Sequence, residues 1–392
     1  FEQVDNDEYD VSLPNKNDVN AEDKEDTSDY EDTEIVRVSI VLDTPSTLEK
    51  GFTSDDISSQ SRRAVRYRRN LQNEQEKVEE AISDEVLDGG ELDVVWNLTL
   101  AANIISANVE YGKIEQIKQI PGVADVVLEQ QYEPAVSENT VQPNMEISTG
   151  MTGTTTAWST GYTGAGMRIA IIDTGLDTSH QSFDNGAYEY ALEQNAARAK
   201  ESVEAYKASL DLLDADEINE KLSLLHIKEG VSAADLYRTE KVAYGYCYID
   251  KDLDVTHETD TEGEHGSHVA GIAAANRYLP DGNGGYVSAL DSVHMHGAAP
   301  DAQVLVMKVF GDEGGAYDSD YTAAIEDAIV LGADTINLSL GSTSPGPSKA
   351  RTEAYQKIFD DLENASSVVT VSSGNAGYWA ENAEPIGYLY SD

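Results

Sequence analysis

The sequence has few cysteines, few basic residues and no long apolar run. One cysteine in 392 residues excludes a disulfide-stapled scaffold and a cysteine-rich zinc module. Lys and Arg number 26 against 73 Asp and Glu, a formal net charge of −47. This balance argues against a nucleic-acid partner, because phosphate binding needs a basic face. No run approaches the roughly 18–20 apolar residues of a membrane span, yet 40% hydrophobic residues suffice for a core.

Composition divides the chain into four segments. Residues 1–34 hold 14 acidic residues and two lysines, which predicts a disordered acidic leader over 1–33. Residues 34–135 alternate strand and helix and predict a small α+β domain with an open sheet. Residues 136–160 are rich in Thr, Ser, Gly, Asn and Pro, which indicates a linker. Residues 161–392 form the last and largest segment.

Each of the two folded segments has a predicted order of elements. In the first, the expected strands are 35–42 and 123–131, a strand and turn are expected over 94–105, and the expected helices are 56–86 and 113–119. In the second, the expected strands are 168–172, 303–309, 335–338 and 367–371, and the expected helices are 266–276, 319–331 and 348–364. This second alternation predicts an α/β fold, a parallel sheet with helices on both faces. Residues 188–228 predict one or two surface helices inserted between motifs.

Three motifs fall where a functional site is expected, at the carboxyl ends of parallel strands or next to them. An apolar strand delivers Asp173 into a glycine turn, His265 opens a helix of small residues, and a strand ends before Asn375. Each alone has a structural explanation. Together they supply a carboxylate, an acid–base imidazole and an amide donor for an oxyanion. His265 and His268 lack the spacing of a zincin helix, which argues against metal.

Residues 157–380 resemble the subtilisin-like serine proteases, or subtilases. The matching motifs are Asp173-Thr174-Gly175, His265-Gly266-Ser267-His268-Val269-Ala270-Gly271, Gly297-Ala298-Ala299-Pro300-Asp301-Ala302 followed by Val306-Met307-Lys308-Val309, Asn337-Leu338-Ser339-Leu340-Gly341, and Ser373-Gly374-Asn375. The resemblance implies a subtilisin-like sheet, with Asp173 and His265 as catalytic residues and Asn375 in the oxyanion hole.

The same resemblance implies where a substrate would lie. Ser339, Leu340 and Gly341 would pair with an extended peptide, and Gly374 would border the pocket. The glycine-rich stretch 311–316, with Gly314 and Gly315, is the expected opposite side. The expected pocket walls, Leu340, Gly341, Ser372 and Ser373, are small or apolar, so protein or peptide substrates with a bulky apolar P1 side chain are expected.

Further features are similar to the lactocepin-type cell-envelope proteinases. They are the long insertion between the Asp and His motifs, the run Val242–Tyr246, and the run Ala324–Ala328. This similarity implies a secreted or cell-envelope protein of bacterial origin. Residues 34–135 resemble the ferredoxin-like propeptide of the family, which implies an intramolecular inhibitor.

The family's nucleophile motif, of the Gly-Thr-Ser-Met-Ala type, does not occur in the sequence. We therefore expect the serine to lie beyond Asp392, on a missing C-terminal segment, so that the catalytic domain is incomplete. The chain is then a zymogen or fragment of a secreted serine endopeptidase with Asp and His but without Ser. The alternative is a catalytically inactive subtilase-fold binding protein, a pseudoprotease. The sequence after Asp392 distinguishes the two.

No cofactor is required by this chemistry, and calcium is the one metal that the sequence suggests. Asp250, Asp252 and Asp254 have the spacing that opens an EF-hand loop. Val255 and Thr261 stand where that loop needs Gly and Glu. A solvated acidic loop is therefore favoured over a calcium site.

Overall fold

The computed structural model describes residues 30–134, 149–257, 260, 263–311, 314–341, 349–362, 365 and 367–372. The acidic leader, except its last residues, lies outside this range. The N-terminal domain contains β1 (Ile35–Leu42), α1 (Ser54–Ser58), α2 (Arg62–Glu85), β2 (Asp93–Leu98), β3 (Ile104–Glu110), η2 (Tyr111–Lys113), α3 (Ile114–Ile117), β4 (Val123–Leu128) and β5 (Glu133–Pro134).

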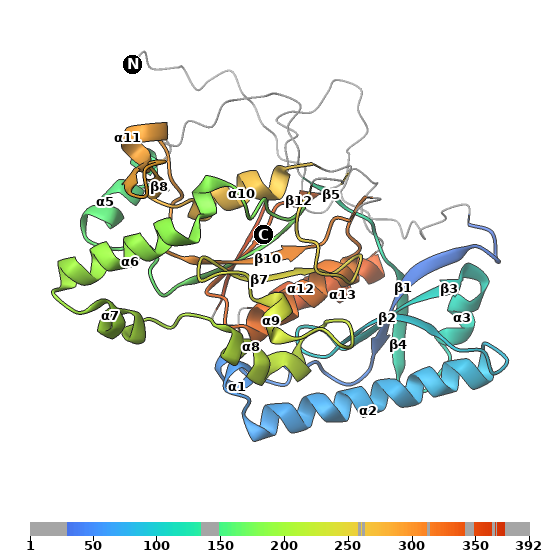
Figure 1. Ribbon diagram of the computed structural model, residues 1–392. Coiled ribbons are helices and arrows are strands. Elements are labelled where there is room, and N and C mark those ends of the chain that lie inside the picture. The colour runs from blue at the N-terminus through green and yellow to red at the C-terminus, as the bar shows by residue number, and fades with distance from the viewer. Residues whose placement is uncertain are drawn as a thin grey trace, which may run out of the picture.

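An antiparallel sheet in the order β2-β3-β1-β4 forms the N-terminal domain (Figure 1). With α2 and α3 as crossovers, this is the ferredoxin-like arrangement. Alternation along β1 turns Val38 and Ile40 to one face, where they pack with Val78 and Ile82 of α2.

Two predicted boundaries in this domain are wrong. The helix expected over 56–86 is interrupted, because the Ser61 side chain accepts a hydrogen bond from the amide of Ala64 and starts α2 as a new helix. The strand and turn expected over 94–105 are two strands, since β3 continues to Glu110 and pairs with β1 along its whole length.

The rest of the described chain contains α5 (Thr154–Ser159), β6 (Arg168–Asp173), η3 (Gln181–Phe183), α6 (Asn185–Ala199), α7 (Val203–Ser209), α8 (Ala215–Lys221), η4 (Leu222–Leu224), α9 (Ala233–Leu236), β7 (Val242–Cys247), α10 (His265–Ala274), β8 (Tyr278–Pro280), β9 (Tyr286–Ser288), α11 (Ala289–Val293), β10 (Gln303–Lys308), α12 (Asp318–Val330), β11 (Thr335–Leu338), β12 (Leu340–Gly341), α13 (Lys349–Leu362) and β13 (Val368–Val371).

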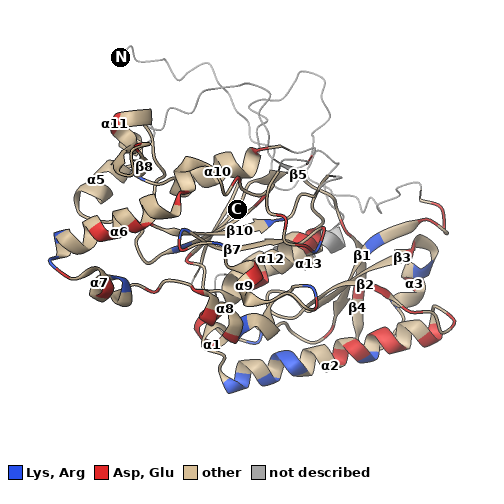
Figure 2. Ribbon diagram, in the orientation of Figure 1, with Lys and Arg blue, Asp and Glu red and all other residues tan. Residues whose placement is uncertain are grey.

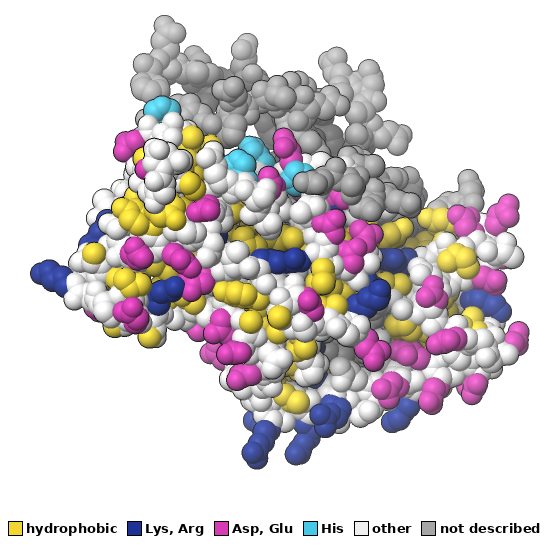
Figure 3. Space-filling model, viewed as in Figure 1, with side chains coloured by type: hydrophobic (Ala, Val, Ile, Leu, Met, Phe, Trp, Pro, Cys, Tyr) yellow, Lys and Arg dark blue, Asp and Glu magenta, His cyan; other side chains and the backbone are white. Residues whose placement is uncertain are grey.

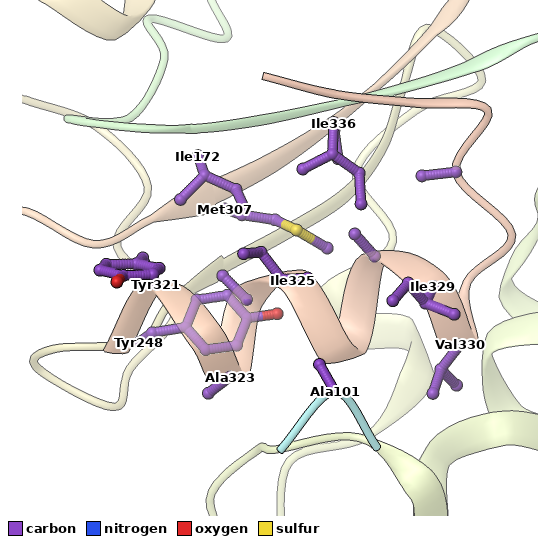
Figure 4. Packing of buried hydrophobic residues seen from close by; sticks show 14 of the residues in the cluster. Ala101, Ile172, Tyr248, Met307, Tyr321, Ala323, Ile325, Ile329, Val330 and Ile336 are labelled. Atoms are coloured by element: carbon purple, nitrogen blue, oxygen red, sulfur yellow. The ribbon is translucent and has the colours of Figure 1, made fainter. Parts of the chain in front are cut away.

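The central sheet of this part is parallel, in the order β13-β11-β6-β10-β7. Helix α10 covers one face, and α12 and α13 cover the other (Figure 1). Strand alternation divides the core accordingly: Ile171 packs toward α10, whereas Ile172, Met307 and Ile336 pack against α12 (Figure 4). The predicted α/β fold with helices on both faces is confirmed.

The insertion between the Asp and His motifs holds more structure than predicted. Residues 188–228 were expected to form one or two helices, but α6, α7 and α8 all lie there or overlap it. Strand β7 was not predicted, because its buried tyrosines and glycine show no simple alternation. The expected linker contains the short helix α5.

The second face of the N-terminal sheet packs on α12 and α13, which lie between the two sheets (Figure 1). Trp96, Leu98 and Val127 belong to the same buried cluster as Ile325 and Ile358. The two domains therefore share this buried cluster, while each also has a cluster of its own.

Helix α2 carries the most clearly divided charge on the surface. Basic residues concentrate at the start of α2, and acidic residues follow along the same helix (Figure 2). On the face shown in Figure 3, acidic side chains are scattered over both domains. Among the described residues, no helix is both long and apolar enough to span a bilayer.

Candidate active site

Asp173 is the last residue of β6, a central strand with β10 and β11 on either side. Its side chain is fully buried, and Oδ1 accepts a hydrogen bond of 2.7 Å from the amide of Thr174. The strand and this bond fix the carboxylate at the carboxyl edge of the sheet, where sites of α/β folds form.

His265 is the first residue of α10, and its Nδ1 lies 2.8 Å from Oδ1 of Asp173. The imidazole is 15% exposed, so one edge of the ring reaches the surface while the carboxylate beneath it does not. A carboxylate facing Nδ1 favours the tautomer protonated there, which leaves Nε2 as the basic nitrogen of the neutral ring.

Close backbone packing holds the two motifs together. The amide of Gly266 donates to the Thr174 hydroxyl at 2.8 Å. A Cβ at Gly266 would overlap the carbonyl oxygen of Gly175, so α10 can start this close to the strand only with glycine there. The amide of Asp177 donates to the Ser267 hydroxyl at 2.8 Å, which adds a second link.

The predicted substrate-binding residues lie along a segment of the N-terminal domain. Strand β12, with Leu340 and Gly341, pairs antiparallel with β5, and Gln131 forms an antiparallel bridge with Tyr317. The amide of Tyr132 donates to Ala316 O at 2.7 Å. Residues 131–134 thus lie between β12 and residues 316–317.

The individual glycines and Ser339 differ in what they contact. A Cβ at Gly315 would overlap the carbonyl oxygen of Tyr132, so the segment approaches closely because residue 315 is glycine. Gly314 instead forms an antiparallel bridge with Gly311. The Ser339 hydroxyl accepts a hydrogen bond from Nδ2 of the Asn337 side chain at 2.9 Å. Gly374 and Asn375 lie outside the described residues.

Sequence reasoning missed a buried ion pair beside the site. Lys308 pairs in register with Asp173 across the sheet, and its Nζ lies 2.7 Å from Asp260 and 2.8 Å from the carbonyl oxygen of Thr256. Burial lowers the pKa of Lys308, but Asp260, together with Cys247 and Asp254, more than offsets this and raises it. The sequence signal was a lysine inside an apolar strand, which is costly to bury without a partner.

The three aspartates proposed for calcium have other partners. Asp252 Oδ1 and Asp254 Oδ1 each accept an amide two residues further on, at 2.9 Å, as in turns. Asp250 lies 3.5 Å from the Cys247 thiol. Within the described part of the chain, no group of three or more His, Cys, Asp or Glu side chains is placed to hold a metal ion. Calcium binding at these residues stays a hypothesis from the sequence.

The lone cysteine has no place in this site. Cys247 ends β7 and is fully buried. Burial raises the pKa of its thiol, which disfavours the thiolate that a cysteine nucleophile needs.

Comparison with known proteins agrees with these motifs. The Peptidase_S8 model, described as the Subtilase family, matches residues 164–389, more than half of the chain. The chain is 28% identical over 281 residues to a PII-type proteinase of Lacticaseibacillus paracasei, covering 70% of this chain and 12% of that protein. It is 29% identical over 247 residues to the minor extracellular protease Vpr of Bacillus subtilis (strain 168), covering 62% and 22%.

Two solved structures are also similar. Fervidolysin from Fervidobacterium pennivorans has a TM-score of 0.44 at 17% identity, covering 88% of this chain and 40% of that one. The epidermin leader peptide processing serine protease from Staphylococcus aureus has a TM-score of 0.46 at 15% identity, covering 88% and 61%.

The chain spans 12% of the length of the PI-, PII- and PIII-type proteinases that it matches. The family model covers the Asp173 and His265 motifs, the central parallel sheet and the α10 and α12 helices that flank it. The chain belongs to the subtilase family.

Proposed function

We propose that the chain is part of the zymogen of a secreted serine endopeptidase, with Asp173 and His265 as two members of its catalytic triad. The observation that carries the proposal is the 2.8 Å contact between His265 Nδ1 and the buried Asp173 carboxylate. The third member, a serine, would come from sequence C-terminal to Asp392. The absence of its motif here and the greater length of the proteinase relatives support this.

In the proposed mechanism, the Asp173 carboxylate accepts a hydrogen bond from Nδ1–H of His265, which fixes the tautomer and stabilises the imidazolium that forms. Nε2 then takes the proton of the serine hydroxyl as it attacks the peptide carbonyl, and returns it to the leaving amine. Asn375 would donate its amide to the oxyanion of the tetrahedral intermediate. Loss of such a donor costs about 100- to 1000-fold in kcat.

An extended peptide would bind by strand addition between β12 and residues 315–317. The N-terminal domain's own segment 131–134 already pairs with both sides, and this geometry supports its role as an inhibitor that occupies the cleft. Residues 34–135 would then act as a propeptide. Main-chain pairing gives affinity with little sequence choice, so protein or peptide substrates are expected.

A secreted or cell-envelope location fits this role. One relative is named an extracellular protease, and the sequence carries one cysteine and a strong negative charge. The charge favours solubility outside the cell, where the enzyme would meet protein substrates.

Labelling with a serine-directed fluorophosphonate tests the proposal. The full-length gene product, once its N-terminal domain is removed, should be labelled, and residues 1–392 alone should not. His265→Ala should abolish labelling, whereas His294→Asn, at an exposed histidine on the end of α11, should leave it unchanged. Absence of labelling in the processed full-length protein would refute the enzyme and favour the inactive binding protein.

A further inference from the structure

The insertion between the Asp and His motifs contacts the N-terminal domain. Four apolar side chains of this insertion pack against the buried cluster that contains Trp96 and Leu98. They are Leu222, Leu224, Leu225 and Ile227. Two hydrogen bonds cross the same boundary, from Gln60 Nε2 to Glu220 O at 2.7 Å and from Arg68 Nη2 to Leu224 O at 3.3 Å. The insertion is thus a docking surface as well as part of the catalytic domain.

His226 lies at the centre of this surface. Its backbone amide donates to Asp327 of α12 at 2.9 Å, and its Nδ1 lies 2.8 Å from Asp327 Oδ1. Its Nε2 points the other way and lies 3.2 Å from the carbonyl oxygen of Asn97, in β2 of the N-terminal domain. Trp96 packs edge-on against the ring, with centroids 6.0 Å apart.

Both ring nitrogens of His226 therefore face oxygens. A backbone carbonyl oxygen accepts only, and the other oxygen of Asp327 already accepts from the Tyr248 hydroxyl at 3.0 Å. A neutral imidazole carries one N–H, so one of its lone pairs would face an oxygen. The imidazolium carries two and satisfies both contacts.

We propose that this insertion is a proton-dependent docking surface for the N-terminal domain, in which doubly protonated His226 joins Asp327 to the carbonyl oxygen of Asn97. Loss of the Nε2 proton removes the bond to Asn97 and turns a lone pair toward it. The inference concerns the regulation of the zymogen and rests on the inhibitory role proposed for the N-terminal domain.

The charges around the ring favour the protonated form. Asp327 and Glu326 face it from α12, the latter at 3.5 Å from Nε2, and Arg68 faces it from α2. Burial lowers the pKa of His226, and Arg68 acts in the same direction, but the two carboxylates outweigh them and raise it above the ordinary 6.5. The stabilisation is therefore complete below pH 6.5 and is lost as the pH rises through the raised pKa.

Nitrogen-15 NMR on the histidine-labelled chain tests this without any catalysis. At pH 6 both ring nitrogens of His226 should carry protons. As the pH rises, Nε2 should lose its proton. Over the same pH range, the amides of residues 99–102 at the domain boundary should lose protection from hydrogen exchange, once their rates are corrected for the pH dependence of intrinsic exchange.

Two variants complete the test. His226→Asn keeps a donor for Asp327 but cannot reach Asn97, so it should remove the pH dependence of that protection. His294→Asn, at an exposed histidine, should retain it.

A neutral His226 at pH 6, or the same pH profile in His226→Asn as in the native chain, would overturn the proposal. If His226→Asn does not fold, the titration of the native ring decides alone. The NMR and hydrogen-exchange experiments need only residues 1–392 and no catalytic activity. A negative result would therefore reject the docking proposal alone, and the fluorophosphonate experiment would still test the protease proposal separately.

Discussion

Replacing Glu326 by Gln tests how the N-terminal domain is held on helix α12. The Glu326 side chain is fully buried on α12 and accepts from four consecutive backbone amides of the N-terminal domain. The amides of Leu100 and Ala101 lie 2.8 Å from Oε1, and those of Thr99 and Ala102 lie 3.3 and 3.4 Å from the carboxylate. The Glu326 carboxylate thus accepts from every amide of the turn 99–102, and among the described residues these amides have no other hydrogen-bond acceptor.

The cost of the replacement follows from these bonds. A hydrogen bond to a charged group contributes about 1.5–3 kcal/mol, roughly twice a neutral one. Gln keeps a neutral oxygen for the two short bonds, so each loses about 1 kcal/mol. The NH2 group of the new Gln side chain would take the place of Oε2 and face the Thr99 amide, so two donors would oppose each other and that hydrogen bond would be lost. The sum is about 2–3 kcal/mol, or roughly 30- to 150-fold in the opening equilibrium.

Native-state hydrogen exchange measures that equilibrium at the amides of residues 99–102. Glu326→Gln should speed their exchange by roughly 30- to 150-fold and leave β6 and β10 protected. Glu80→Gln, which removes an exposed charge from α2, serves as the matched control and should change nothing. An acceleration of less than about threefold in Glu326→Gln would refute the role of this carboxylate.

Three further predictions concern the cleft, pH and calcium. Gly315→Ala should displace segment 131–134, because the new Cβ would overlap the carbonyl oxygen of Tyr132. An added protease should then cleave the chain near residue 134 faster than in the native protein, and an unchanged cleavage rate would contradict the prediction. Burial, together with the nearby Asp318 and Asp320, raises the pKa of Glu129 to about 7. The folded state therefore favours the protonated carboxyl, and its stability should fall by up to about 3 kcal/mol as the pH rises from 4.5 to 7. In Glu129→Gln, the free energy of unfolding, measured with urea, should no longer fall as the pH rises over that range. The same pH dependence in the variant as in the native chain would exclude Glu129 as its source. Calcium should not shift the thermal midpoint relative to EDTA, and a rise would restore the calcium hypothesis.

The contact between Asp173 and His265 was predictable because its signals are local. Asp173 follows an apolar strand and precedes a glycine, and His265 starts a run of small residues, so the sequence shows both the residue and its setting. The parallel sheet was predictable for the same reason, except at β7. There, Tyr244 and Tyr246 are buried beside Gly245, a pattern that matches neither a helical nor an alternating period.

The interface between the domains was not predictable. Asp318, Asp320, Glu326 and Asp327 belong to a helix whose residues are all buried, although carboxylates in a helix usually lie on its exposed side. Their partners come from segments some 100 to 230 residues away, such as Trp96 Nε1 on Asp320 at 2.8 Å. Only the folded chain brings these groups together, and no short-range pattern announces them.

The assignment of Asp173 and His265 is tested most directly by the kcat of Asp173→Asn in the processed full-length enzyme, measured on an unstructured protein substrate. Asn in place of Asp would hold His265 in the wrong tautomer while keeping the geometry, so kcat should fall by about 10⁴-fold. Asp216→Asn, at an exposed position on α8, should leave kcat unchanged. A fall of less than about tenfold in Asp173→Asn would contradict the catalytic role of the pair.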